Sequence, residues 1–394
     1  MPGIASNANW THEDVFDLAQ SVQFGCTGSQ PLVDLQWAQN FSKLNRKITT
    51  GVDDFMGNDD MSQLYRCNST ADLNYLGVAT GGTGGTGTGV ENFLESKYLK
   101  AGPLGGAAGA GGEQQVYRQY PLGAGFKGTS LGVDRNFYGG GVEMTLKLNC
   151  GTGDKMAFAA GTTTNPSSAS ISATSVSINN CFLYLAVEQN QPIIQSLMAL
   201  YATGDLKFRI PYTIAFRKVG GAANAQSTIQ IGVSSNYGKR LKKILHSVWN
   251  PVETQNKAYD CSNFSTKVAS YQTFIDNMPL QDRVLDCRSS AAAEVYSDDW
   301  AENKKFLERR SCILSKKMYQ INWFHQDSFF EPRDKDGGLP EVNLDEGLEL
   351  VQGGTIRNWQ FTYTAGTQAN SVHYSYLEFT RDVHVVPGQG AQFY

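Results

Sequence analysis

The sequence has few charged residues and no long apolar run. Only 18% of its 394 residues are Asp, Glu, Lys or Arg, and the formal net charge at pH 7 is −4. A charge this small gives no global attraction to nucleic acid. No stretch reaches the roughly 20 apolar residues of a transmembrane helix. Residues 1–6 show no basic start followed by an apolar segment, so no signal peptide is expected.

Cysteine is present, but not in a pattern that predicts a disulfide framework or a metal site. The number of cysteines is odd and no C-x-x-C motif occurs; the seven are Cys26, Cys67, Cys150, Cys181, Cys261, Cys287 and Cys312. Disulfide frameworks favour an even number of cysteines, and zinc sites favour closely spaced pairs. We therefore expect reduced, mostly buried thiols and synthesis in the cytosol.

Residues for catalysis or cofactor binding do not gather in a specific motif. Residues 82–87 fit G-x-G-x-x-G, but another Gly-rich loop occupies the region where a dinucleotide site needs an acidic residue. The histidines have no metal-ligand spacing, and we interpret His325, near Asp327, as a partly buried residue of an aromatic loop. Residues 334–338 lack the glycine and closing glutamate that a calcium loop needs. The sequence predicts no enzyme, no cofactor and no metal.

The sequence does contain many short strand patterns. In residues 142–149 apolar and polar side chains alternate, which places every second residue on a buried face. Further strands are predicted at 181–187, 212–219, 228–233, 244–249, 271–275, 357–363 and 373–386. The predicted helices are few: 14–20, 192–202 with an early proline, and 297–310 with acidic residues before basic ones. Gly-rich segments 81–89 and 102–112 predict long surface loops. Many short strands separated by Gly-rich loops, together with few helices, indicate β-sandwiches.

The order of these elements resembles a known family. Segment 177–187 resembles the last strand of a first roll, helix 192–202 follows, and 208–214 opens a second roll. Segments 239–244 and 271–279 then follow in order, and the chain closes with 353–365 and 374–379. This pattern is similar to the double jelly-roll major capsid proteins of tailless icosahedral dsDNA viruses. The virophage and polinton-like branch is most similar, and the adenovirus and tailless-phage shells are remoter.

The resemblance implies an all-β fold of two tandem eight-stranded jelly-roll β-sandwiches, a double jelly roll, with few short helices. Residues 1–60 would be an N-terminal segment that can hold opening strands of roll 1, and 61–190 the first jelly roll. Residues 191–204 would form a connecting helix, and 205–394 the second jelly roll with a C-terminal tail. We expect residues 205–390 to form one complete sandwich whose last strand is 373–386.

The resemblance also implies a structural role in the virion, after synthesis in the host cytoplasm. The chain would form a homotrimer, a pseudo-hexameric capsomer that contacts neighbouring capsomers and minor capsid proteins. Contact with the viral genome or an internal membrane would be indirect, and no small-molecule substrate is expected. Loops 80–115 and 161–175 and the terminal segments would reach across to neighbours.

Three alternatives to a major capsid protein stay open. They are a minor capsid or vertex protein, a glycan-binding β-sandwich of spike or lectin type, and an enzyme on a β-sandwich scaffold. An exposed Trp/Tyr patch would favour glycan binding, and a convergent cluster of titratable residues in a pocket would favour the enzyme.

One basic strip is dense enough to suggest a contact. Lys239, Arg240, Lys242 and Lys243 lie within five positions of one another. We interpret them as a contact with the genome or a neighbouring subunit, with a solvated loop edge as the alternative.

Overall fold

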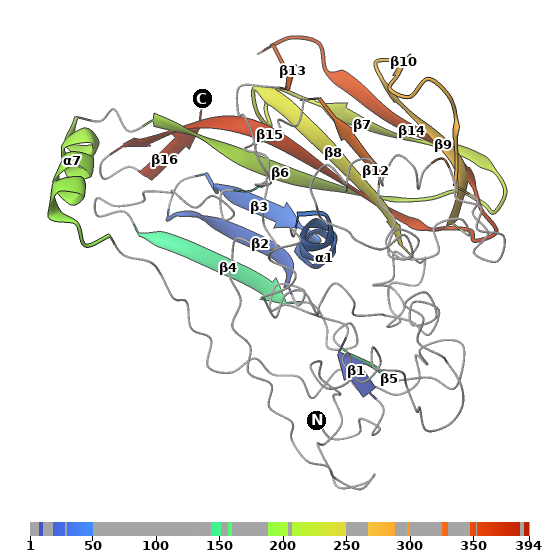
Figure 1. The fold of residues 1–394 in the computed structure, drawn as a ribbon, viewed down its shortest axis with the longest axis horizontal. Helices are drawn as coiled ribbons and strands as arrows, with labels where there is room; N and C mark the ends of the chain where they lie inside the picture. The colour runs from blue at the N-terminus through green and yellow to red at the C-terminus, as the bar shows by residue number, and fades with distance from the viewer. Residues whose placement is uncertain are drawn as a thin grey trace, which may run out of the picture.

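The structure is a computed structural model of the chain, and strands dominate the residues that it describes (Figure 1). Those residues are 8–10, 19–27, 30–49, 129, 143–150, 157–159, 188–203, 207–249, 267–287, 298, 325–329, 347–351, 353–386 and 390–393. The all-β prediction is confirmed. The strand predicted at 181–187, the Gly-rich loops, segment 161–175 and all but one residue of helix 297–310 lie outside the described residues.

The first half of the chain contributes five described strands and two helices. They are β1 (Ala8–Trp10), β2 (Ala19–Cys26), β3 (Val33–Gln36), α1 (Ala38–Thr49), β4 (Met144–Cys150), β5 (Ala157–Ala159) and α7 (Gln191–Ala202). The pairs β1–β5, β2–β3 and β2–β4 are antiparallel. Because β2 and β3 share a sheet with β4, residues 19–36 are part of the same layer as residues 144–150.

The second half contributes eleven strands. They are β6 (Lys207–Val219), β7 (Gln226–Val233), β8 (Arg240–Trp249), β9 (Val268–Ile275), β10 (Met278–Pro279), β11 (Leu285–Asp286), β12 (His325–Ser328), β13 (Leu348–Glu349), β14 (Arg357–Ala365), β15 (Val372–Val386) and β16 (Gly390–Phe393). Every predicted strand in this half is present. Strand β16 pairs with the end of β15, so the described part of the C-terminal tail folds back on its own chain.

The pairing order identifies this half as a jelly roll. In one sheet the order is β6, β15, β8, β12; in the other it is β7, β14, β9, with β10 and β11 both paired to β9. The first strand therefore pairs with the last long strand, and the second with the one before it. This is the antiparallel connectivity of an eight-stranded double Greek key. The described strands between residues 207 and 386 have this connectivity, which agrees with the predicted fold class.

The core of the jelly roll follows from strict alternation along its strands. On β14, Trp359, Phe361 and Tyr363 are buried while their neighbours in sequence are partly exposed. Ile231 on β7 and Tyr271 on β9 lie on the same inner face. Period-two burial of this kind is typical of a sheet with one face toward solvent.

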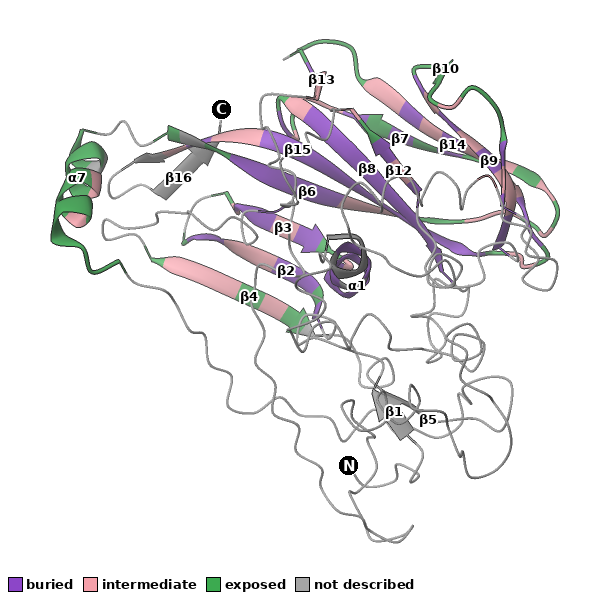
Figure 2. Ribbon diagram, in the orientation of Figure 1, coloured by how far each residue is buried: buried purple, intermediate pink, exposed green. Residues whose placement is uncertain are grey.

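Strand β8 breaks this alternation because a third layer covers its outer face. Residues 241–249 are all buried, and Figure 2 shows β8 in purple after its first residue. Leu245 and Trp249 on β8 and Tyr376 on β15 pack against β2, β3 and α1 in a second apolar core. The hydroxyl of Tyr376 donates a hydrogen bond to the Trp37 carbonyl (3.1 Å), and the Phe41 ring centroid lies 5.0 Å from that of Tyr376.

The helices differ partly from expectation. Helix α7 agrees with the predicted 192–202 helix, but α1 was not predicted, and residues 19 and 20 of the predicted 14–20 helix are strand. Within the described residues, no helix is long and apolar enough to span a membrane. Cys26 and Cys287 are buried, as expected.

Candidate assembly surface and buried polar networks

The outer face of the β7–β14–β9 sheet carries no charged side chain. Three cross-strand rows cover it: Gln230, Gln360 and Phe274; Thr228, Thr362 and Gln272; Gln226, Thr364 and Ser270. The hydroxyls of Thr228 and Thr362 lie 3.1 Å apart, within hydrogen-bond distance. The outer face of these three strands is uncharged and, apart from Phe274, polar; Asp286 on the short strand β11, opposite Ser270, lies at its margin. The face can therefore contact an identical face without bringing like charges together.

The exposed large apolar residues in the described chain are all aliphatic. They are Ile193, Met198, Leu200, Val219, Met278, Leu280, Val284, Val351 and Ile356. Three of them lie on α7, which stands apart from the sheets (Figure 1). No Trp or Tyr whose side chain is described is exposed. The aromatic patch that would favour a glycan-binding protein is therefore not seen in this part of the chain.

The four residues of the basic strip do not form one exposed surface. Lys239 is exposed and ion-paired with Asp382, which also accepts a hydrogen bond from Arg209 Nε (2.8 Å). Burial alone would raise the pKa of Asp382, but these two cations hold it below its usual value. Arg240 is partly exposed and opens β8.

Lys242 and Lys243 lie inside the protein. Lys242 occupies the β-bulge where β8 shifts register against β15, and its exposed fraction is 0%. Lys243 Nζ lies 2.9 Å from Glu378 Oε2, its cross-strand partner on β15, and both side chains are buried. A buried ion needs such a partner, because an isolated charge costs several kcal/mol in a low-dielectric interior. These two lysines therefore do not belong to a basic surface of the chain.

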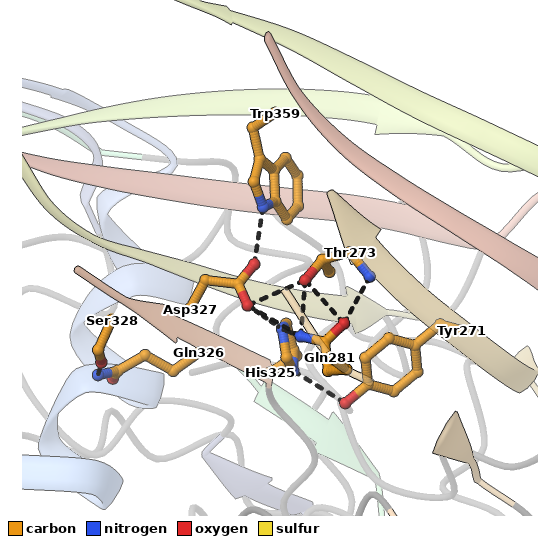
Figure 3. A network of polar contacts seen from close by, with 8 residues as sticks. All are labelled: Tyr271, Thr273, Gln281, His325, Gln326, Asp327, Ser328 and Trp359. Carbon is orange, nitrogen blue, oxygen red and sulfur yellow. Dashed lines mark hydrogen bonds and ion pairs between the residues drawn. The ribbon is translucent and has the colours of Figure 1, made fainter. Parts of the chain in front are cut away.

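His325 and Asp327 form the centre of a buried hydrogen-bond network (Figure 3). Both lie on β12, with His325 Nε2 2.8 Å from Asp327 Oδ1. The Tyr271 hydroxyl on β9 lies 2.8 Å from His325 Nδ1. Trp359 Nε1 on β14 donates to Asp327 Oδ2 (2.7 Å), and the Thr273 hydroxyl donates to Oδ1 (2.9 Å). The network therefore joins the two sheets of the jelly roll across its core.

This network connects the two sheets and has a structural role. Burial alone would raise the pKa of Asp327, but the His325 ring and the hydrogen bonds from Trp359 and Thr273 outweigh burial and lower it. His325 is 5% exposed and Asp327 6%, so neither can meet a substrate from solvent. The expected aromatic loop around His325 is in fact a strand, but its interpretation as a non-catalytic histidine agrees with this burial. No group of metal-binding side chains occurs among the described residues.

A second buried cluster contains His246 on β8 and His373 on β15. His246 Nδ1 lies 2.8 Å from the Ser375 hydroxyl, and its Nε2 lies 3.1 Å from His373 Nδ1. Burial lowers the pKa of His373 to about 3. Burial, reinforced by His373 and His325, lowers the pKa of His246 well below its usual value. Both rings are therefore neutral at pH 7.

Gly220 is required beside this cluster. A methyl group at position 220 would lie 2.9 Å from His373 Nε2 and 2.8 Å from the Tyr363 hydroxyl. The Tyr363 hydroxyl in turn accepts the backbone N–H of Gly221 (3.0 Å). Sequence reasoning named His325 near Asp327 but missed their partners Tyr271, Thr273 and Trp359, and it missed the His246–His373 cluster. The available signal was polar residues at inward positions of otherwise apolar strands, such as Thr273 between Tyr271 and Ile275.

Comparison with known proteins places the chain beside viral capsid structures. Neither a protein-family model nor a curated protein matches it. A chain of the PBCV-1 virus capsid matches with 8% identity and a TM-score of 0.44, covering 100% of this chain and 86% of that chain. A chain of the Sputnik virophage matches with 10% identity and a TM-score of 0.43, covering 100% and 77%. The major capsid protein P2 of bacteriophage PM2 matches with 9% identity and a TM-score of 0.29, covering 96% and 88%.

Proposed function

We propose that the chain is a structural capsid protein, a major capsid protein that builds the shell of an icosahedral virus. The observation that carries the proposal is the combination of a jelly roll with a charge-free outer face. Flat sheets that present Gln, Thr, Asn and Ser can pack against copies of themselves with little desolvation of charge. The residue pattern that resembles double jelly-roll capsid proteins supports the same role.

The proposed assembly unit is a homotrimer with a pseudo-hexameric outline. The third layer of β2, β3 and β4 packs on the jelly roll and contributes a second set of strands beside it (Figure 1). Three copies of such a paired β unit can present six similar flanks, which suits a hexagonal lattice. The exposed aliphatic residues of α7 support a subunit contact, since an uncharged helix exposed on most sides is normally covered.

The proposed role is structural, not enzymatic, and lies in the virion. The clearest titratable clusters of the described chain are buried and hydrogen-bonded inside the sandwich. Of the basic strip, Lys239 and Arg240 retain exposure and are proposed to contact a neighbouring subunit or the genome. Minor capsid proteins are proposed as further partners.

The experiment that tests this function measures self-association of the full chain. We expect trimers by analytical ultracentrifugation at micromolar concentration, and hexagonal arrays or shells by negative-stain electron microscopy. Obligate interfaces of this class bury more than about 2,000 Å² in total, so trimers should persist on dilution. A monodisperse monomer that forms no larger particle would contradict a capsid role.

A further inference from the structure

The two long outer strands of the jelly roll, β6 and β7, differ sharply in how their edges are protected. Within the described residues, β6 pairs with β15 alone and β7 with β14 alone. Each strand therefore has one side whose backbone N–H and C=O groups lack a strand partner there. Exposed edges of this kind can join other chains, and proteins usually block them with charge, proline or a covering segment.

Strand β6 carries all three protections. Pro211 lies within it, and a proline cannot donate a ladder hydrogen bond. Four cations flank the proline: Lys207, Arg209, Arg217 and Lys218. Strand β3 also lies beside β6 (Figure 1). A second copy of β6 could not pair here without bringing lysines and arginines together.

Strand β7 carries none of these protections. Its sequence, QSTIQIGV, has no charged residue and no proline. Gln226, Thr228, Gln230 and Gly232 are exposed on its outer face, while Ile229, Ile231 and Val233 line the core. Ile356, which is 62% exposed, packs at the end of the strand against Gly232. Within the part of the chain that the structure describes, eight residues of regular, uncharged, β-favouring strand thus have no strand partner along one edge.

We infer that β7 is a homotypic docking edge: it pairs antiparallel with β7 of a second copy of this chain. This inference rests on the proposed capsid function and names one contact within the assembly. Pairing β7 with itself opposes glutamine and threonine to glutamine, threonine or glycine, so no like charges meet. It would continue the β7–β14–β9 sheet of one copy into that of its partner through a twofold axis.

The period of the strand restricts the register. Side chains alternate between faces, so the outer faces of the two sheets continue into each other only when even-numbered positions oppose even-numbered positions. The two such registers with the longest overlap place Gln230 opposite Gln230 or opposite Thr228 of the partner strand. In both registers, charges introduced at 228 and 230 lie opposite or diagonal to their counterparts.

A charge-exchange experiment tests this contact on the full chain. Two double variants place like charges on the edge, Thr228→Lys/Gln230→Lys and Thr228→Glu/Gln230→Glu. The matched control, Thr362→Lys/Gln360→Lys, places the same charges at the cross-strand neighbours on central strand β14. All four sites lie on the outer face, so circular dichroism and the melting temperature should show that each variant folds.

We expect each β7 variant alone to form particles with an apparent association constant about tenfold weaker than the wild type. Mixing the lysine and glutamate variants should restore association to about the wild-type value, because opposite charges then meet. The β14 control carries its charges on the outer face away from the edge, so it should weaken assembly less than the β7 variants do. Light scattering as a function of protein concentration measures the apparent association constant of each variant and of the mixture.

Three results would overturn the inference and leave the proposed function intact. One is a wild type that assembles while the β7 variants assemble equally well. A second is a mixture that behaves as the average of its components, since β7 then contacts something other than β7. Equal impairment by the β14 control would likewise assign the effect to the face and not to the edge. A wild-type chain that never self-associates contradicts the capsid function itself.

Discussion

At the scale of single residues, the jelly-roll core depends on polar groups that have no access to solvent. His246 and His373 lie among Trp359, Phe361 and Tyr363, and His325 of the neighbouring network helps to lower the pKa of His246. The two rings contact each other, and His246 also contacts the Ser375 hydroxyl; none of these groups is a carboxylate. Protonation of either ring would therefore place a charge in an apolar interior.

This arrangement predicts a loss of stability in mild acid. Because both folded-state pKa values lie below the ordinary 6.5, the unfolded chain binds more protons than the folded chain as the pH falls below that value. The free energy of unfolding should be highest above about pH 6.5 and fall by about 2 kcal/mol by about pH 5 through His373, with a further decrease from His246. Urea unfolding at a series of pH values measures this.

The control is His373→Gln, which keeps a polar side chain at the site and removes one titrating ring. Its unfolding free energy should fall less than that of the wild type over the same range. Aspartates titrate at lower pH, and Asp327 titrates lower still because its pKa is depressed. An equal decline in both proteins would assign the acid sensitivity to groups other than His373.

At the scale of elements, β2, β3 and α1 attach to the jelly roll through an apolar core that also includes a cross-layer hydrogen bond. Phe41 is 2% exposed and its ring lies against that of Tyr376. The Tyr376 hydroxyl adds its hydrogen bond to the Trp37 carbonyl. The packing contribution should therefore exceed the polar one.

The prediction compares two substitutions at this junction. Phe41→Ala should lower the free energy of unfolding by about 3–5 kcal/mol, because it leaves a large cavity between the layers. Tyr376→Phe should cost about 1 kcal/mol, because it removes one hydrogen bond and keeps the ring. Urea denaturation followed by tryptophan fluorescence measures both. A smaller loss for Phe41→Ala than for Tyr376→Phe would mean that the layers are not held by packing.

At the scale of the whole molecule, the neutral faces predict that assembly depends little on salt. Contacts between uncharged surfaces are hardly screened, so the association constant should change less than about threefold between about 0.05 M and about 0.5 M NaCl. DNA binding through Lys239 and Arg240 would instead weaken steeply over the same range. Light scattering and a DNA titration, with Lys239→Ala/Arg240→Ala as control, separate the two. Strongly salt-dependent assembly would contradict contact through the neutral faces.

Much of the second half was predictable because the alternation of apolar and polar residues along each strand indicates which side chains are buried. The alternation in Arg357–Ala365 and the long apolar pattern of Val372–Val386 each describe one strand of a sandwich, and the structure has both. Helix α7 was predicted from its early proline and apolar stripe. Local period and turn residues carry this information, so no tertiary contact was needed to find these elements.

The sequence by itself determined the all-β class, the strands of the second half and the scarcity of charge. Tertiary structure decided which charged side chains are exposed to solvent. Lys243 belongs to a basic strip in the sequence, yet it is buried against Glu378, 135 positions later, because β8 pairs with β15 and a third layer covers both. The same holds for His325 and Asp327, whose partners Tyr271 and Trp359 come from the opposite sheet. The alternation of residues along a strand shows on which face of the sheet a side chain lies. The pairing between distant strands decides which residues that face contacts.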